Sequence, residues 1–347
     1  MRHLIHTIGI FCFSLYSSIL FAQSYKPPVF TDPDRLKKIE AAYPLIDKIY
    51  KDYAEQNHFP GLVYGIVLDG KLVHSGGVGR TELKGKLPAT SQSDFRIASM
   101  SKSFTAMAIL KLRDQGKLKL DDPLYLYIPE AKNMKPLTGD APPITIRHLL
   151  THSAGFPEDN PWGDRQLANT DQQLIDIYKK GVSFSNGPGL GYEYSNLGFA
   201  TLGYIIKKVS GKTYQEYITE NILKPLGMTH TYWEYDKVPK ELLAHGYRWM
   251  DNQWVEQPLL HDGSYGAMGG MITTIEDFSK YVALHLDAWP PRDDAETGPV
   301  KRSSIREMQY PWDVSGFNVN YKTATGRPNP FVSAYCCLLY TSPSPRD

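Results

Sequence analysis

The sequence predicts an α+β fold, in which an antiparallel sheet is flanked by helices and interrupted by an inserted, mostly helical lobe. Three observations support this prediction. A helical pattern opens the chain, a strand–turn–strand pattern follows it, and a long series of helical segments then separates this hairpin from a return to strands. Elements that come in runs of one type, rather than in strict alternation, are typical of α+β domains.

The first predicted element is an amphipathic helix over residues 34–56, where apolar side chains recur every three or four positions. Residues 62–68 and 71–75 then have the composition of two strands. The dipeptide Asp69-Gly70 between them suits the positive φ angles of a primed turn, so we expect the two strands to form a hairpin.

A long buried helix is predicted over residues 99–115, because alanine, methionine and leucine are frequent there and Gly116 is placed to end it. Four further segments predict the helical lobe: residues 145–150, 171–180, 197–209 and 213–223. A last helix over residues 276–286 has Thr274 as its candidate N-cap. Beyond Trp289 the chain is rich in proline and charge, and we expect a loop.

The composition limits the class of function. The chain has 347 residues, of which 41% are hydrophobic and 22% charged, and its 38 basic residues balance 37 acidic ones. This moderate hydrophobicity excludes a protein with many membrane spans, and the near-zero net charge argues against a nucleic-acid partner. The three cysteines, Cys12, Cys336 and Cys337, stand near the two ends, which excludes a disulfide framework or a thiolate metal cluster between them.

Residues 1–22 have the pattern of a signal peptide, with Arg2 at the start, an apolar run that ends at Phe21, and a small residue, Ala22, before the expected cleavage site. A single anchoring helix is the alternative, but the apolar run is shorter than the roughly 18 to 20 residues that span a bilayer. We therefore expect a periplasmic or secreted protein with no stable membrane insertion after cleavage.

Residues 337–347 resemble the translation of a transposase sequencing adaptor read in frame. A polar, proline-containing tail is the alternative interpretation. If the adaptor interpretation holds, the gene was cut near codon 336, and the folded domain comprises residues 23–336.

The strongest chemical signal is the S-x-x-K spacing of Ser99 and Lys102 at the start of a predicted helix, which places both side chains on one face. A serine hydroxyl is a weak nucleophile until a base takes its proton. A lysine can act as that base only when burial or a nearby positive dipole lowers its pKa. The spacing therefore predicts a nucleophile and its base together, although a solvated serine and lysine are the ordinary alternative.

A second signal is Tyr194 and Asn196, two residues apart in a loop just before a predicted helix. The tyrosine can relay a proton once neighbouring positive charge lowers its pKa, and the asparagine can hold a carbonyl group. The alternatives are that tyrosine is common in this chain, with 23 copies, and that an asparagine at a helix start is an ordinary cap.

These motifs, in this order, resemble those of the serine beta-lactamase and penicillin-binding-protein superfamily, in particular the branch of class C beta-lactamases, D-alanyl-D-alanine carboxypeptidases and esterases. The S-x-x-K motif of that family matches Ser99 and Lys102, and its Y-x-N motif matches Tyr194 and Asn196. The resemblance extends from about residue 40 to 290, and three flanking segments share it: residues 149–157, 223–228 and 267–274.

The resemblance implies a beta-lactamase/transpeptidase-like fold and a serine hydrolase without cofactor or metal. Ser99 would attack a carbonyl carbon and form an acyl-enzyme that water releases, with Lys102 and Tyr194 sharing the proton transfers. Asn196 would bind the substrate. Which of Lys102 and Tyr194 is the general base stays open. His152 lies in a family-like turn, so we expect it to support the site rather than to bind a metal.

The family's third motif, K-T-G or H-x-G on a strand, would supply a second oxyanion donor beside the backbone N–H of Ser99. Residues 322–326 read K-T-A-T-G, in a loop-like stretch with no strand pattern after it. We therefore expect the third motif beyond residue 336, and a domain that here lacks its C-terminal strands.

Three substrate classes stay open, namely beta-lactams, D-amino-acid peptides and short esters, so the expected partner is a small molecule or a peptide. The oligomeric state also stays open. Two alternatives to an active hydrolase remain: a non-catalytic, penicillin-binding-like ligand-binding or sensor protein, and an inactive truncated fragment.

Overall fold

The structure is a computed structural model that describes residues 27–335, except residues 86, 161–162, 323–325 and 329–330. The predicted signal peptide, the adaptor-like tail and all three cysteines lie outside the described residues. The α-helices are α1 (Arg35–Glu40), α2 (Tyr43–Gln56), α3 (Ser101–Asp114), α4 (Ile146–Leu150), α5 (Asp171–Lys180), α6 (Asn196–Ser210), α7 (Tyr214–Ile218), α8 (Ile275–Asp287) and α9 (Arg302–Met308). The strands are β1 (Gly61–Leu68), β2 (Lys71–Gly79), β3 (Phe95–Arg96), β4 (Thr231–Tyr232), β5 (Tyr247–Met250), β6 (Gln253–Glu256), β7 (Ile272–Thr273), β8 (Asp313–Asn318) and β9 (Phe331–Tyr335).

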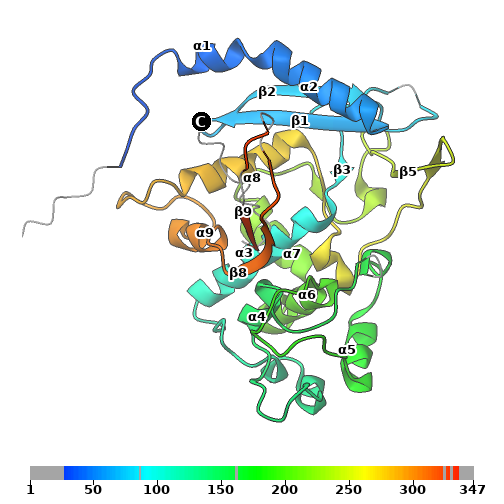
Figure 1. Ribbon diagram of the computed structural model, residues 1–347, viewed down its shortest axis with the longest axis vertical. Helices are drawn as coiled ribbons and strands as arrows, with labels where there is room; N and C mark the ends of the chain where they lie inside the picture. The colour runs from blue at the N-terminus through cyan, green and yellow to red at the C-terminus, as the bar shows by residue number, and fades with distance from the viewer. Residues whose placement is uncertain (1–26, 86, 161–162, 323–325, 329–330, 336–347) are drawn as a thin grey trace, which may run out of the picture.

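The predicted hairpin is confirmed. Strands β1 and β2 pair antiparallel from Gly61 opposite Gly79 to Leu68 opposite Lys71. The turn between them has φ angles of 49° at Asp69 and 75° at Gly70, as a primed turn requires. Helices α2 and α8 pack on opposite sides of this hairpin (Figure 1). The single helix expected over residues 34–56 is instead two helices, α1 and α2.

A short three-stranded sheet brings distant parts of the chain together. Its central strand β7 pairs antiparallel with β3 and with β4. Phe95 and Thr231 both lie opposite Thr273. Helices α4 to α7 come between β3 and β4 in the chain and lie away from the hairpin (Figure 1). The predicted antiparallel sheet with an inserted helical lobe is therefore confirmed, and the strand before Ser99 is fixed beside residues 272–273.

The main core surrounds α3 and α6. Phe104 and Met107 on α3 and Phe199 on α6 are fully buried, and α3 ends where Gly116 takes a φ of 72°, as predicted. In the lobe, α5 has the predicted bounds. The segment expected as one helix over 213–223 forms α7 and then a π-helical turn, η5 (Thr219–Leu223).

One very close contact joins α6 of the helical lobe to the turn that precedes β7. Gly203 on α6 faces η7 (Ser264–Met268), a 3₁₀ turn that precedes β7. A Cβ atom added at Gly203 would lie 2.4 Å from the Cβ of Ala267. Only a glycine lets the backbones of α6 and η7 approach this closely.

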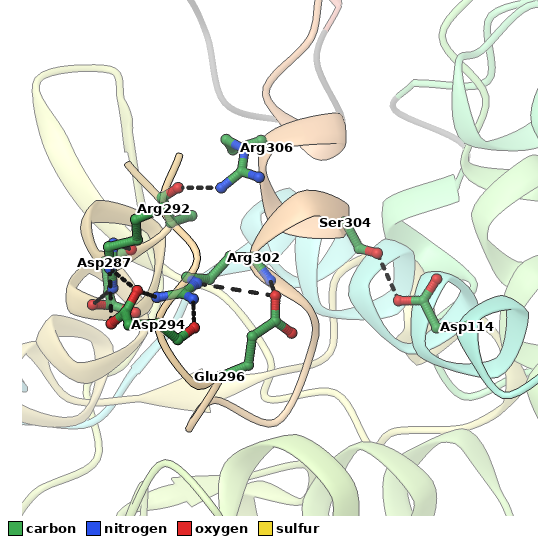
Figure 2. Close-up of polar contacts among 9 residues, drawn as sticks. Asp114, Asp287, Arg292, Asp294, Glu296, Arg302, Ser304 and Arg306 are labelled. Carbon is green, nitrogen blue, oxygen red and sulfur yellow. Dashed lines mark hydrogen bonds and ion pairs between the residues drawn. The ribbon is translucent and has the colours of Figure 1, made fainter. Parts of the chain in front are cut away.

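The expectation of a loop beyond Trp289 is wrong, because α9, β8 and β9 lie there. Figure 2 shows Arg302 of α9 reaching Asp294 and Glu296, with N–O distances of 2.8 Å and 4.0 Å. This helix of seven residues is too short to be stable by itself, so contacts with the preceding charged segment hold it in place. The charged residues Asp294 and Glu296, which favoured a loop in the sequence, therefore pair with a helix that follows them.

Among the described residues, no helix combines the length and the apolar composition needed to cross a membrane.

Candidate active site

Ser99 lies in η1 (Ala98–Met100), the 3₁₀ turn that leads directly into α3, and its side chain is half-buried. Ala98 has a φ of 46°, in the left-handed region that a residue with a Cβ adopts only at a cost. The hydroxyl of Ser101 donates to the Ala98 carbonyl at 2.7 Å and accepts from the Met271 N–H at 3.1 Å. The turn that carries Ser99 is thereby fixed to the residues that lead into β7.

Lys102 is fully buried, as the sequence predicted, with 0% of its surface exposed. Its ammonium donates to Ser99 Oγ at 3.1 Å, to Asn196 Oδ1 at 2.8 Å and to the Met268 carbonyl at 2.7 Å. Each of these three acceptors is an uncharged oxygen. These hydrogen bonds offset part of the cost of removing the ammonium from water.

Tyr194 reaches the same serine. Its Oη lies 2.7 Å from Ser99 Oγ, at hydrogen-bond distance, and its ring centroid lies 4.9 Å from Lys102 Nζ. The Ser99 hydroxyl is therefore within reach of two groups that can exchange protons with it.

Asn196 is the first residue of α6 rather than its cap. The N-cap is Ser195, whose Oγ accepts from the Gly198 N–H at 3.1 Å. The Asp159 carboxylate also lies at this helix start, where it accepts from the N–H groups of Asn196 and Leu197 at 2.7 Å and 2.8 Å. A negative group at a helix N-terminus is favourable. The capping interpretation of Asn196 is therefore wrong.

The side chain of Asn196 is fixed at both ends. Its Oδ1 accepts from Lys102, and its Nδ2 donates to Asn160 Oδ1 at 2.7 Å. Asn196 itself is fully buried, whereas Asn160 is exposed. The two hydrogen bonds orient the amide so that its oxygen faces the lysine.

His152 supports the tyrosine segment, in agreement with its expected role. Its Nδ1 accepts from the Ser195 N–H at 3.0 Å, and its ring centroid lies 4.5 Å from that of Tyr194. Burial, together with the charge of Lys102, holds the pKa of His152 well below its usual range. The imidazole is therefore neutral and holds its proton on Nε2.

Sequence reasoning missed three partners of the site: Asp159, Asn160 and Met268. The first two lie in a loop without a recognisable motif, and Met268 acts through its main-chain carbonyl, which every residue carries. The only signal for Met268 is its place in the family-like segment 267–274. In the part of the chain that the structure describes, no three histidine, cysteine or acidic residues are grouped so as to hold a metal ion.

The K-T-A-T-G stretch lies between β8 and β9, and residues 323–325 are outside the described part. The expectation that no strand follows it is wrong, because β9 begins at Phe331. The expected third motif beyond residue 336 also lies outside the described residues.

Residues 46–332 match the model of the beta-lactamase family. Protein flp of Staphylococcus aureus strain N315 is 32% identical over 299 residues, which make up 86% of this chain and 55% of that protein. Beta-lactamase-like protein 2 of Dictyostelium discoideum is 30% identical over 295 residues, or 83% of this chain and 53% of that protein. The chain therefore spans about half the length of the curated relatives it matches.

Two solved structures have a similar fold. The octameric penicillin-binding protein homologue from Pyrococcus abyssi matches with a TM-score of 0.64 and 29% identity, over 88% of this chain and 64% of that one. A class C beta-lactamase matches with a TM-score of 0.63 and 24% identity, over 81% of this chain and 71% of that one. The range 46–332 that matches the family model contains the serine, lysine, tyrosine and asparagine described above, and the chain belongs to the beta-lactamase family.

Proposed function

We propose that the protein is an exported serine hydrolase that forms an acyl-serine intermediate at Ser99 on an amide or an ester. One observation carries the proposal: Ser99 Oγ is contacted by Lys102 Nζ at 3.1 Å and by Tyr194 Oη at 2.7 Å. A serine with candidate bases at hydrogen-bond distance is the arrangement of an activated nucleophile.

The proposed reaction has two steps. Ser99 Oγ attacks the carbonyl carbon, and its proton passes to the Lys102–Tyr194 pair, which returns a proton to the leaving nitrogen or oxygen as that bond breaks. Water then attacks the acyl-serine ester, the pair takes its proton, and a carboxylic acid leaves as the serine hydroxyl regains a proton. The ammonium near the tyrosine ring favours a phenolate, so either residue can hold the proton in transit.

The backbone N–H of Ser99 is the proposed oxyanion donor on this chain, because it lies at the start of α3, where the helix dipole favours negative charge. The fixed turn at Ala98 sets the direction of that N–H. The substrate is a beta-lactam, a D-amino-acid peptide or a short ester. The similarity to a penicillin-binding protein homologue and to a class C beta-lactamase supports the first of these classes, and the other two stay open beside it.

Covalent labelling tests the proposal. A fluorescent penicillin and a fluorophosphonate are each incubated with the unaltered protein and with Ser99→Ala, and the adducts are measured by intact mass. We expect one adduct on the unaltered protein and none on Ser99→Ala. Undiminished labelling of Ser99→Ala would contradict the assignment. Reversible binding of penicillin with no adduct on either protein would favour the ligand-binding alternative.

Three further measurements address the length of the gene product, its substrate class and its export. The source gene is sequenced beyond codon 336 without a transposase adaptor, and its product is assayed beside the 347-residue chain. Turnover of nitrocefin, a D-Ala-D-Ala peptide and p-nitrophenyl acetate then separates the three substrate classes. Export predicts a mature protein that begins at Gln23 in the periplasm or medium, which N-terminal sequencing checks.

A further inference from the structure

The segment of residues 260–271, here called the glycine-rich segment, holds one side of the site. Its Met268 carbonyl accepts from the Lys102 ammonium at 2.7 Å, and its Ala267 carbonyl accepts from the Thr105 hydroxyl at 2.7 Å. A main-chain carbonyl cannot change its rotamer, so its position depends wholly on how the segment is held. The groups that hold the segment therefore determine where the Met268 carbonyl meets Lys102, beside Ser99.

Arg96 holds the segment at two places. It lies on β3, three residues before Ser99, and its guanidinium is half-buried. Nη2 donates to the Leu260 carbonyl at 2.6 Å, and Nη1 donates to the Gly270 carbonyl at 3.1 Å. These two carbonyls lie on either side of Met268 in the chain, so one planar fork fixes both ends of the stretch between them.

Asp262 belongs to the same segment and lies beside two of its glycines. It accepts from the Tyr214 hydroxyl and from Gln215 Nε2, the latter at 2.9 Å. A Cβ atom added at Gly266 or Gly270 would lie 1.6 Å or 2.0 Å from Asp262 Oδ1. The carboxylate thus occupies the space that the two glycines leave. Burial raises the pKa of this carboxyl group to about 6, and the positive charge of Arg96 is among the influences that oppose this rise.

We propose that Arg96 is a positioning residue for the acyl transfer at Ser99: by holding the carbonyls of Leu260 and Gly270, it fixes the Met268 carbonyl that orients the Lys102 ammonium. This inference rests on the proposed function, because it assigns a role in that same site. Arg96 does not touch the reacting atoms. It acts through the backbone of the glycine-rich segment, in which Asp262 fills the space beside Gly266 and Gly270.

The physical reason is geometric. Lys102 reaches Ser99 along a flexible four-carbon chain, and the Asn196 oxygen alone cannot fix where its nitrogen lies. A misplacement of about 1 Å in a reacting group can reduce a rate by roughly 100-fold. A lysine at position 96 would keep the positive charge, but it has no planar fork with which to hold two carbonyls in a fixed relation.

The test compares Arg96→Lys with the matched control Arg302→Lys. Arg302 is buried, whereas Arg96 is half-buried, and it too donates to a main-chain carbonyl, but that carbonyl belongs to Asp294. The first readout is amide hydrogen exchange at Gly269 and Gly270, whose N–H groups donate to the Gly266 carbonyl at 2.9 Å and 2.7 Å. The second is the rate of Ser99 labelling by a fluorophosphonate, measured from pH 5 to 9 over a range of probe concentrations.

For Arg96→Lys we expect faster exchange at both glycines and labelling slower by roughly 10- to 100-fold at saturating probe, with an unchanged half-saturating concentration and an altered pH profile. For Arg302→Lys we expect unchanged exchange at the glycines and an unchanged labelling rate. Labelling of Arg96→Lys at the original rate and pH profile, or equal losses in both variants, would overturn the proposal.

If Arg96→Lys does not fold, Arg96→Gln decides by the same criteria, because its amide keeps a planar pair of N–H donors on a side chain that is shorter and uncharged. The outcome also separates the serine hydrolase function from the positioning role of Arg96. An unaltered protein that no probe labels refutes the proposed function, and this inference with it. An unaltered protein that labels, beside an Arg96→Lys variant that labels equally fast, refutes only the role of Arg96.

Discussion

The site and the α9 region each bury a cation, and they hold it in opposite ways. Lys102 is 0% exposed and donates to three uncharged oxygens, those of Ser99, Asn196 and Met268. Arg302 is 6% exposed and pairs with the carboxylates of Asp294 and Glu296 (Figure 2).

The two cations differ in what they can do chemically. An arginine keeps its proton in proteins, so Arg302 can anchor a helix but cannot serve as a base. A lysine can exchange a proton, and under the proposed function Lys102 does so with Ser99.

The comparison is tested most strongly by removing each cation in turn. We expect Lys102→Met to slow labelling of Ser99 by at least about 10³-fold, because the serine loses one of its two proton acceptors and the charge that favours the tyrosinate. Arg302→Met is expected to label at the original rate per folded molecule. The labelling reaction is quenched at a series of times, and the adduct is measured by intact mass. The folded fraction of each variant is first determined by circular dichroism. Similar losses in both variants would remove the distinction between the two cations.

Asp94 extends the comparison to a buried carboxyl group whose oxygens have, in the described part of the chain, neither an uncharged nor a charged hydrogen-bond partner. It is fully buried, and neither of its carboxylate oxygens has a hydrogen-bond partner among the described residues. Burial, with the nearby charge of Asp277, raises the pKa of Asp94 to about 7. The folded state therefore keeps a proton that the unfolded state loses above about pH 4, so stability falls from about pH 4 to 7 and then levels off.

We expect Asp94→Asn to remove this pH dependence. The variant should be more stable than the unaltered protein by roughly 2 to 4 kcal/mol at pH 8 and equal to it near pH 4, since a tenfold change in proton affinity is worth about 1.4 kcal/mol. Urea unfolding at both pH values measures the difference. An equal effect at pH 4 and pH 8 would show that Asp94 is not protonated in the folded state.

The tyrosine tests whether the lysine acts alone. We expect Tyr194→Phe to slow labelling by roughly 100-fold, less than Lys102→Met, because the serine keeps Lys102 Nζ as a partner. The pH profile of the remaining activity reports the lysine, and a fluorophosphonate titration from pH 5 to 10 measures it. Unchanged labelling would assign Tyr194 to packing only.

The smallest expected effect concerns the anchoring arginine. Arg302→Met should lower the free energy of unfolding by about 1 to 3 kcal/mol, because the Asp294 carboxylate is 61% exposed and water compensates for part of the lost pair. Chemical denaturation in low salt checks this value. A loss above about 4 kcal/mol would mean that α9 controls the whole fold, which a local anchor does not.

Much of this arrangement could be predicted from short-range patterns. The spacing of Ser99 and Lys102 on one helix face depends only on the helical repeat, and the Asp69-Gly70 turn depends only on local φ angles. The bounds of α5 follow from its capping box at Thr170 and its apolar stripe. In each case the physical cause lies within a few residues of the feature.

The rest depends on contacts that no local pattern encodes. The distance from Tyr194 to Ser99 is set by the packing of α6 on α3, and Met268 contributes an atom that all residues share. Helix α9 was missed because its partners are charged residues several positions away. The capping alternative for Asn196 rested on how often asparagine caps helices, whereas here Ser195 and Asp159 satisfy the helix start.

The close approach of Gly203 to Ala267 has a consequence for how new activities could arise. Asn196 is on α6 and Met268 is on η7, so the contact joins two of the lysine's acceptors in one rigid body. We expect the two acceptors to be displaced together rather than separately. Under the proposed function, residues outside this contact can then change what fits beside Ser99 without moving these acceptors, so specificity can vary while the surroundings of the lysine are inherited.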